Sequence, residues 1–212
     1  MRPELTALLD RLPEVDTSLA DTFEPHGPFK EGIPMFAVLH WWTVTPWDWS
    51  ADQPADGKAL AKLEWMKARP GVGSYHGVEF GGTPYQTSAL MEKAWHAGGS
   101  PGLRDTNSRS VGFAIATPSP SMRPRRIEGE VQRPWFNRAD KTMGRAWYPP
   151  VSERSLLAAV AFFRWWQQKA GVQFSGVYLH HHINPQKNDL RNMDAPHNTG
   201  LVFGDFLALV KA

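Results

Sequence analysis

The sequence contains no cysteine. Disulfides are therefore excluded, and any metal site would have to be built from His, Asp or Glu side chains. Long apolar runs are missing as well, because no segment reaches the roughly 18 apolar residues that a membrane-spanning helix needs. We therefore expect neither a disulfide framework nor a stable insertion into a membrane.

The sequence also lacks a large excess of charge of either sign. The chain has 23 Lys and Arg against 21 Asp and Glu, which gives a formal charge of +2. This mildly basic balance does not favour nucleic acid as a partner, but it suits an anionic polymer such as a cell wall. Residues 1–16 lack a signal-peptide pattern, since charged residues interrupt their short apolar stretch. We expect synthesis in the cytoplasm, with access to a wall only after release or delivery.

The distribution of apolar residues, 42% of the chain, predicts a single α/β domain with a mixed central β-sheet flanked by helices. Ser152 and Gly171 are typical of the two ends of a long helix. We expect strands at 36–40, 75–80, 84–87, 110–116 and 176–179, and helices at 3–12, 57–69, 152–170 and 199–210.

Two segments stand apart from this pattern. Residues 1–34 are expected to form an N-terminal helix and arm packed on a domain that spans 35–212. Residues 117–150 are rich in Pro and Arg, and predict an irregular insertion over the surface. The insertion is either a solvated loop or a flap that contacts the wall or the substrate.

Two buried strands end in histidine, in the segments FAVLH (to His40) and GVYLH (to His180). A histidine at the end of a buried strand is held rigidly at the rim of a sheet, where functional sites are usually built. The second strand continues into a segment with Lys187 and Asp189. Two imidazoles and one carboxylate are the ligand set of a catalytic zinc that keeps one position open. In extended backbone Lys187 would share a side with Asp189, where its ammonium could stabilise an oxyanion.

Four blocks of the sequence carry a family resemblance. They are VLHWWT, GVGSYHGVEFGGTPYQ, KAWHAGGS followed by NSRSVGFAIA, and HHHINPQKND, and together they span residues 36–189. In this order they resemble the zinc N-acetylmuramoyl-L-alanine amidases of the phage-lysozyme and peptidoglycan-recognition type. The resemblance implies the fold of this family and a zinc cofactor. It also implies hydrolysis of the amide between N-acetylmuramic acid and L-alanine in bacterial peptidoglycan. A phage or prophage endolysin or an antibacterial effector, active as a monomer, would fit this activity.

The resemblance also implies a role for each matching residue. His40, His180 and Asp189 would be the metal ligands. Lys187 would stabilise the tetrahedral intermediate, and Tyr75 would assist the water or the scissile carbonyl.

The substrate groove is assigned to residues near these ligands. The resemblance places His96 in the groove, where it could bind the peptide stem, and Asn107 is assigned to substrate binding with it. Trp41 and Trp42 could form an aromatic floor or wall of the groove, with core packing as the alternative.

Some features depart from the family pattern or leave a choice open. Ala114 occupies a position where many members carry a glutamate base, which gives Tyr75 more weight. Counting back from Pro185 selects His180 among three adjacent histidines, and His182 would share its side in extended backbone. Asp194 is a competing third ligand.

Two other functions are weighed against the amidase. One is a peptidoglycan-recognition module that binds without catalysis, which would not need three ligands, a lysine and a tyrosine together. The other is a non-haem iron oxygenase, which also uses two histidines and a carboxylate. The order of the ligands along the chain disfavours that second class.

Overall fold

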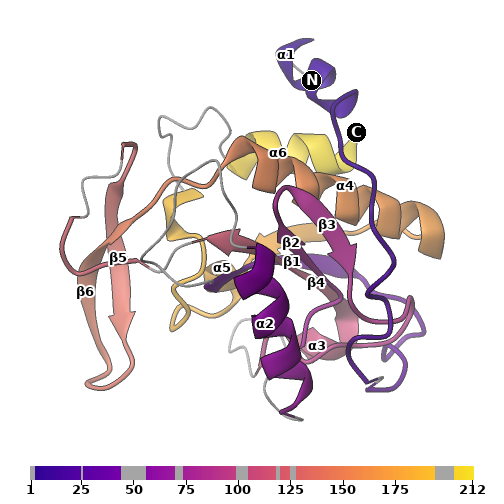
Figure 1. Ribbon diagram of the computed structural model, residues 1–212, viewed down its shortest axis with the longest axis horizontal. Helices are drawn as coiled ribbons and strands as arrows, with labels where there is room; N and C mark the ends of the chain where they lie inside the picture. The colour runs from indigo at the N-terminus through magenta and orange to yellow at the C-terminus, as the bar shows by residue number, and fades with distance from the viewer. Residues whose placement is uncertain are drawn as a thin grey trace.

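The computed structural model describes residues 3–24, 26–43, 56–69, 74–98, 105–117, 120–124, 128–193 and 203–212. Its centre is a five-stranded sheet with the order β3-β2-β4-β1-β7 (Figure 1). Strands β2, β4, β1 and β7 run parallel, and β3 pairs antiparallel with β2, so the predicted mixed sheet is confirmed. The strands are β1 (Phe36–Thr43), β2 (Gly77–Phe80), β3 (Thr83–Gln86), β4 (Ser110–Thr117) and β7 (Gly176–Leu179).

Successive side chains of β4 point to opposite faces of the sheet. Because they are apolar on both faces, helices pack against both. Phe113 and Ile115 pack in the larger core, together with side chains of α4 (Glu153–Ala170) and α6 (Phe203–Lys211). Ala114 and Ala116 pack in a second cluster with side chains of α2 (Asp56–Lys67). The sheet is therefore buried between two helical layers, as the apolar pattern predicted.

Helix α4 begins and ends where the sequence indicates. The Ser152 hydroxyl accepts a hydrogen bond from the Ser155 backbone N–H, which satisfies one free donor of the first turn. Gly171 closes the helix in the left-handed conformation, with φ at 66°. The N-terminal helix α1 (Pro3–Leu9) lies against this side of the molecule, where Leu5 joins the larger core.

The prediction for residues 117–150 is wrong in its main point. Most of this segment is an antiparallel hairpin of β5 (Val131–Asn137) and β6 (Thr142–Tyr148), which forms a sheet of its own. The hairpin stands beside the body of the molecule (Figure 1). Its inward positions mix apolar and charged side chains, so the alternation that signals a strand is absent from the sequence.

Short helices complete the described structure. They are α3 (Thr106–Arg109), α5 (His180–Ile183) and the 3-10 helix η1 (Arg191–Met193). Within the described residues, none of the helices is long and apolar enough to cross a membrane.

Candidate metal centre

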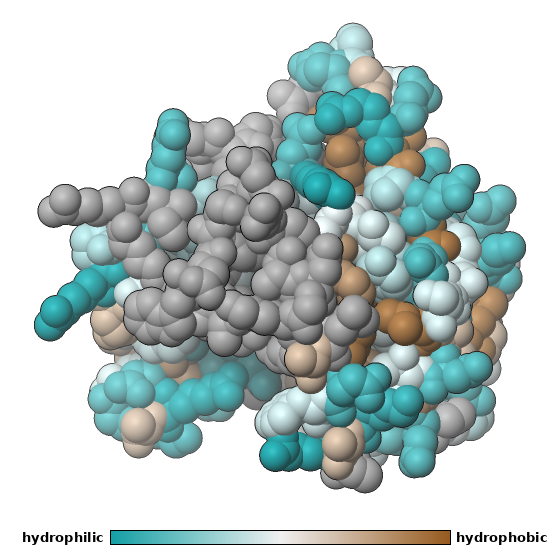
Figure 2. Space-filling view, in the orientation of Figure 1, coloured by the Kyte–Doolittle hydropathy of each residue, from teal (hydrophilic) through white to brown (hydrophobic). Residues whose placement is uncertain are grey.

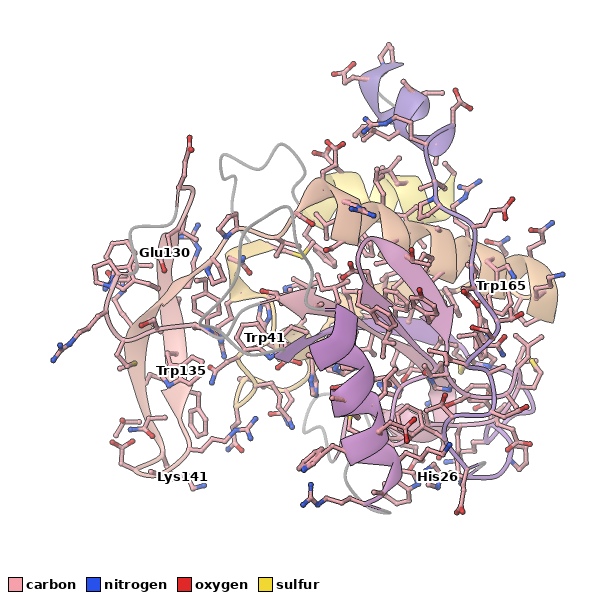
Figure 3. The ribbon with its side chains drawn as sticks, viewed as in Figure 1. His26, Trp41, Glu130, Trp135, Lys141 and Trp165 are labelled. Atoms are coloured by element: carbon pink, nitrogen blue, oxygen red, sulfur yellow. The ribbon has the colours of Figure 1, made fainter. Side chains whose placement is uncertain are left out.

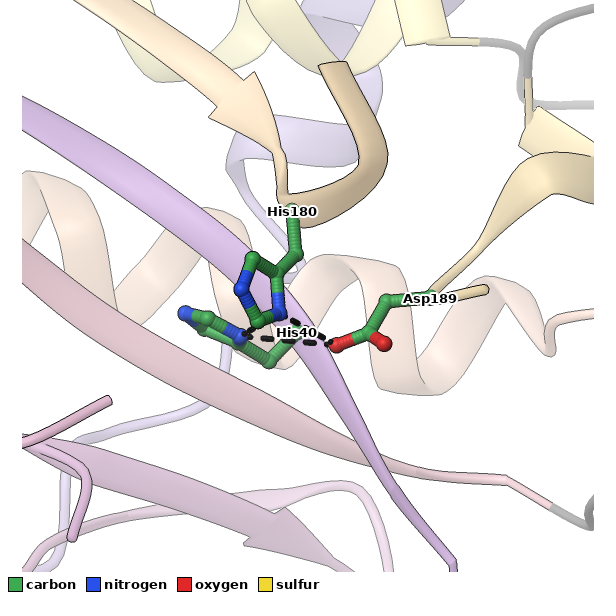
Figure 4. A group of neighbouring side chains, drawn as sticks. All are labelled: His40, His180 and Asp189. Carbon is green, nitrogen blue, oxygen red and sulfur yellow. Dashed lines mark hydrogen bonds and ion pairs between the residues drawn. The ribbon is translucent and has the colours of Figure 1, made fainter. Parts of the chain in front are cut away.

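The two predicted strand-end histidines meet because their strands are direct neighbours. β1 and β7 pair in parallel with Leu39 opposite Leu179, so the next residue of each chain segment is a histidine. The prediction that His40 ends its strand is wrong, because β1 continues to Thr43 and His40 is its fifth residue. His180 directly follows β7 and opens α5. Asp189 comes from the loop that follows α5 and points its carboxylate at both rings (Figure 4). All three residues are buried.

Three electron-pair donor atoms converge at this point. The Nδ1 atoms of His40 and His180 are 2.9 Å apart, and His180 Nδ1 lies 2.8 Å from Asp189 Oδ2. The remaining side of the triangle, from His40 Nδ1 to Asp189 Oδ2, measures 3.5 Å. These are the three residues predicted to be metal ligands, and they form a group that could hold a metal ion.

In both rings the other nitrogen, Nε2, faces away from the centre and has a hydrogen-bond partner. His180 Nε2 donates to the Ala97 carbonyl at 3.2 Å. His96 Nε2 lies 3.1 Å from the Ser110 carbonyl, which can only accept, so the proton of this ring sits on Nε2. His96 Nδ1 is therefore an acceptor for His40 Nε2–H at 2.9 Å. This chain of bonds leaves the Nδ1 lone pair of His40 facing the centre.

The electrostatics of the centre agree with a neutral His40. Burial, and next the nearby His180, lower the pKa of His40 to about 3. Burial alone would raise the pKa of Asp189, but the two neighbouring histidines outweigh it and hold the pKa well below its usual range. The site therefore offers an unprotonated imidazole and a carboxylate at neutral pH.

These residues fit a zinc ion. Ligand atoms about 2.0 to 2.2 Å from a tetrahedral zinc lie roughly 3.3 Å from one another, and the three sides of the triangle bracket this value. A cation at this buried point would pair with the lone pair of His40 Nδ1 and with the carboxylate charge of Asp189. Two imidazoles and one carboxylate leave a net charge of +1 with a zinc ion.

A pocket opens beside the triangle, and Tyr75 and Lys187 line it together with His180 and Asp189. The Tyr75 ring lies 5.3 Å from the His40 ring. Burial first, and Asp189 second, raise the pKa of the Tyr75 phenol, so it stays protonated at neutral pH. Burial is also the main cause that lowers the pKa of Lys187. The pocket is lined by Trp41, Tyr75, Trp95, His96, Gly98, Arg138, His180, Lys187 and Asp189.

Of the four residues assigned to substrate binding, Trp41 lines this pocket as expected of a groove residue. The assignment of Trp42 is wrong: only 2% of it is exposed, it packs in the second core cluster, and its indole N–H donates to the Glu79 carbonyl. Side chains alternate along β1, so the residue after Trp41 turns into the core.

The assignment of Asn107 to substrate binding stays a prediction, since this residue is not among the described residues that line the pocket. Its Oδ1 accepts from the backbone N–H groups of His96 and Ala97, at 3.1 and 2.8 Å. This fixes the segment whose Ala97 carbonyl holds His180. His96 does line the pocket, but its two ring nitrogens face His40 and Ser110, which favours a positioning role over binding of the peptide stem.

The three adjacent histidines lie in a helical turn, which separates the directions of their side chains. Residues 180–183 form α5 rather than extended backbone, so the expectation that His182 shares a side with His180 is wrong. His182 is exposed, whereas His181 Nδ1 contacts the Asp189 carbonyl at 2.5 Å. Asp194 lies outside the described residues.

The absence of a glutamate from β4 has a visible consequence. Ala114 is the register partner of His40 and is fully buried in the second core cluster. A carboxylate at this position would adjoin the centre, whereas the alanine side chain can act as neither an acid nor a base.

A buried triad with one open side is typical of a metal-dependent hydrolase. Residues 31–197 match the model of the N-acetylmuramoyl-L-alanine amidase family. The chain therefore belongs to this family and is an amidase. No curated protein matches the sequence.

Several solved structures share the fold. The hydrolase AmiA of Staphylococcus aureus, described in complex with its ligand, is 11% identical with a TM-score of 0.56, over 100% of this chain and 90% of that one. A mutant endolysin from Bacillus subtilis is 16% identical with a TM-score of 0.51, over 94% and 97% of the two chains. The catalytic domain of XlyA is 16% identical with a TM-score of 0.52, over 93% and 97%.

Proposed function

We propose that this protein hydrolyses the amide bond between N-acetylmuramic acid and L-alanine in bacterial peptidoglycan, with zinc held by His40, His180 and Asp189. The observation that carries the proposal is the buried triangle of three donor atoms beside an open pocket. Membership of the amidase family supports the class of bond. Bound at these atoms, zinc would polarise the scissile carbonyl and make hydroxide available near neutral pH.

Lys187 and Tyr75 are the side chains that we assign to the reaction. Lys187 donates to the carbonyl oxygen as negative charge develops on it. Tyr75 keeps its proton, because burial raises its pKa, so it acts as a hydrogen-bond donor rather than as a base. Since Ala114 offers no carboxylate, Tyr75 is also the group that orients the attacking water.

We propose that the protein acts on the wall as a phage or prophage endolysin, or as an antibacterial effector. The fold that it shares with an endolysin from Bacillus subtilis supports this setting. The alternative is a peptidoglycan-recognition module without catalysis. The ordered hydrogen bonds behind His40 and His180 favour the enzyme, because a module that only binds has no need to orient metal ligands.

Metal content and turnover of three proteins test the proposal. The wild type should carry one zinc per chain and cleave purified peptidoglycan. Lys187→Ala should keep its zinc and lose roughly 10²-fold or more in turnover, because it removes a donor to the oxyanion. Asp189→Ala should lose both zinc and activity.

Two outcomes would contradict this assignment. A wild-type protein that sediments with the wall, holds no zinc and cleaves nothing is a binding module. Full zinc and full activity in Asp189→Ala would move the third ligand to Asp194 or another group.

A further inference from the structure

The side chain of Asn188 helps to anchor the β5–β6 hairpin beside the metal centre. Asn188 Oδ1 accepts from the Phe136 N–H at 2.8 Å, and Asn188 Nδ2 donates to the Phe136 carbonyl at 3.0 Å. The amide thus pairs with the backbone of β5 as a neighbouring strand would. Asn188 is buried and stands between Lys187 and Asp189. The hairpin is therefore fixed to the loop that carries the candidate ligand and the candidate catalytic lysine.

This anchoring creates a second pocket that continues the first. It lies between the hairpin and the end of β1, and it shares Trp41, Arg138 and Asp189 with the pocket at the metal centre. Figure 3 shows Trp135 on the hairpin and Trp41 at the end of β1. In Figure 2 the hairpin forms a lobe set apart from the body of the molecule by a notch. The substrate groove therefore extends from the metal centre along the hairpin.

Apolar walls and a rigid support define this extension. Trp41 stacks on Tyr148, with ring centres 5.8 Å apart and planes at 20°. The Tyr148 hydroxyl in turn donates to the Pro134 carbonyl of β5 at 3.1 Å. These contacts hold the aromatic wall of the extension in place beside Arg138, which is itself exposed to solvent.

The charged residues of the two pockets are mostly cationic. Arg138 follows β5 directly and lines both pockets, and Lys187 lines the first. Among the described lining residues the one acid is Asp189, whose carboxylate already faces His40 and His180. A guanidinium with no acid of its own in the groove suits a carboxylate on the ligand.

We propose that Arg138 binds a carboxylate of the peptide stem, in a subsite walled by Trp41 and Trp135. The proposal rests on the proposed function, since the stem is the acidic part of that substrate. A planar guanidinium recognises a carboxylate through two parallel hydrogen bonds. The hairpin would thus select stems that carry the free acid over stems in which it is a carboxamide.

Binding of the released stem peptide tests the subsite without depending on turnover. The probes are two synthetic peptides of the sequence L-alanine–γ-D-glutamate–diamino acid, one with a free α-carboxylate on the glutamate and one with a carboxamide. Calorimetry on the zinc-loaded protein gives Kd for each. Arg138→Gln should weaken binding of the carboxylate peptide about tenfold or more, and should leave the carboxamide peptide nearly unchanged.

The matched control is Arg145→Gln. Arg145 is an exposed arginine of the same hairpin that lines neither described pocket. This variant should bind both peptides as the wild type does, and Arg138→Lys should fall between Arg138→Gln and the wild type. Equal binding of the carboxylate peptide by Arg138→Gln and the wild type would overturn the subsite, as would an equal loss for both peptides.

A failure of the proposed function would appear in cleavage rather than in peptide binding. A wild-type protein that cleaves no muropeptide contradicts the amidase assignment. Selective loss of the carboxylate peptide in Arg138→Gln would still establish the subsite in that case.

Discussion

His96 should control how tightly the centre holds zinc, although it contacts the centre only through His40. Its Nδ1 accepts from His40 Nε2–H, and its own Nε2 is anchored at Ser110. His96→Leu removes this acceptor and leaves a donor unsatisfied on a fully buried ring. An unsatisfied buried donor costs about 1 to 3 kcal/mol, and loss of a partner behind a ligand costs roughly 10- to 100-fold in metal affinity. We expect zinc affinity to fall within that range.

His96→Asn is the matched variant, because the Asn Oδ1 can take the place of the histidine Nδ1 and accept from His40. It should lose no more than about fivefold in zinc affinity, well short of the loss expected for the leucine variant. Competition with a chromophoric chelator gives both affinities, and thermal unfolding of the metal-free proteins gives their stabilities. Wild-type zinc affinity in His96→Leu would refute the reasoning. So would losses of affinity in both variants that merely follow their losses of stability.

Three further predictions concern the surroundings of the centre. Gly112→Ala should weaken zinc binding and lower the melting temperature, because a Cβ there would lie 2.3 Å from His96 Cγ; Gly144→Ala, whose Cβ would meet nothing within 4 Å, is the control and should have little effect on zinc binding. Tyr75→Phe should reduce turnover and keep zinc, and unchanged turnover would remove Tyr75 from the reaction. The pKa of His76 is lowered by burial from 6.5 to about 3, so its stabilising contribution is present above pH 6.5 and is lost as pH falls towards 3. The difference in unfolding free energy between the wild type and His76→Gln should therefore narrow by about 2 kcal/mol from pH 7 to pH 5, as urea titrations can measure, and parallel pH profiles would contradict it.

The parts of the fold that could be predicted are those with local signals. The boundaries of α4 at Ser152 and Gly171 follow from capping chemistry. The sequence also predicts that the first strand ends at His40, but β1 runs on to Thr43 and His40 lies within it. His40 and His180 still converge, because β1 and β7 are parallel neighbours with Leu39 opposite Leu179.

The parts that sequence reasoning missed depend on contacts between distant residues. Nothing local shows that Asn188 pairs with Phe136, 52 residues away, or that His96 supports His40, 56 residues away. The hairpin was overlooked because its inward positions include Arg133 and Pro134 stands within β5. Trp42 was misassigned because two adjacent tryptophans look alike in sequence while alternate faces of a strand separate them.

The chemical ends that appear in purified peptidoglycan show directly whether this site is a zinc-dependent amidase. They are identified after digestion with protein that has been stripped of metal, and again after zinc is restored. Zinc-dependent amide hydrolysis predicts free L-alanine amino termini that appear only with zinc and increase with time. It also predicts that they fail to appear with Asp189→Ala. New reducing sugar ends, or amino termini that form equally well without zinc, would contradict it.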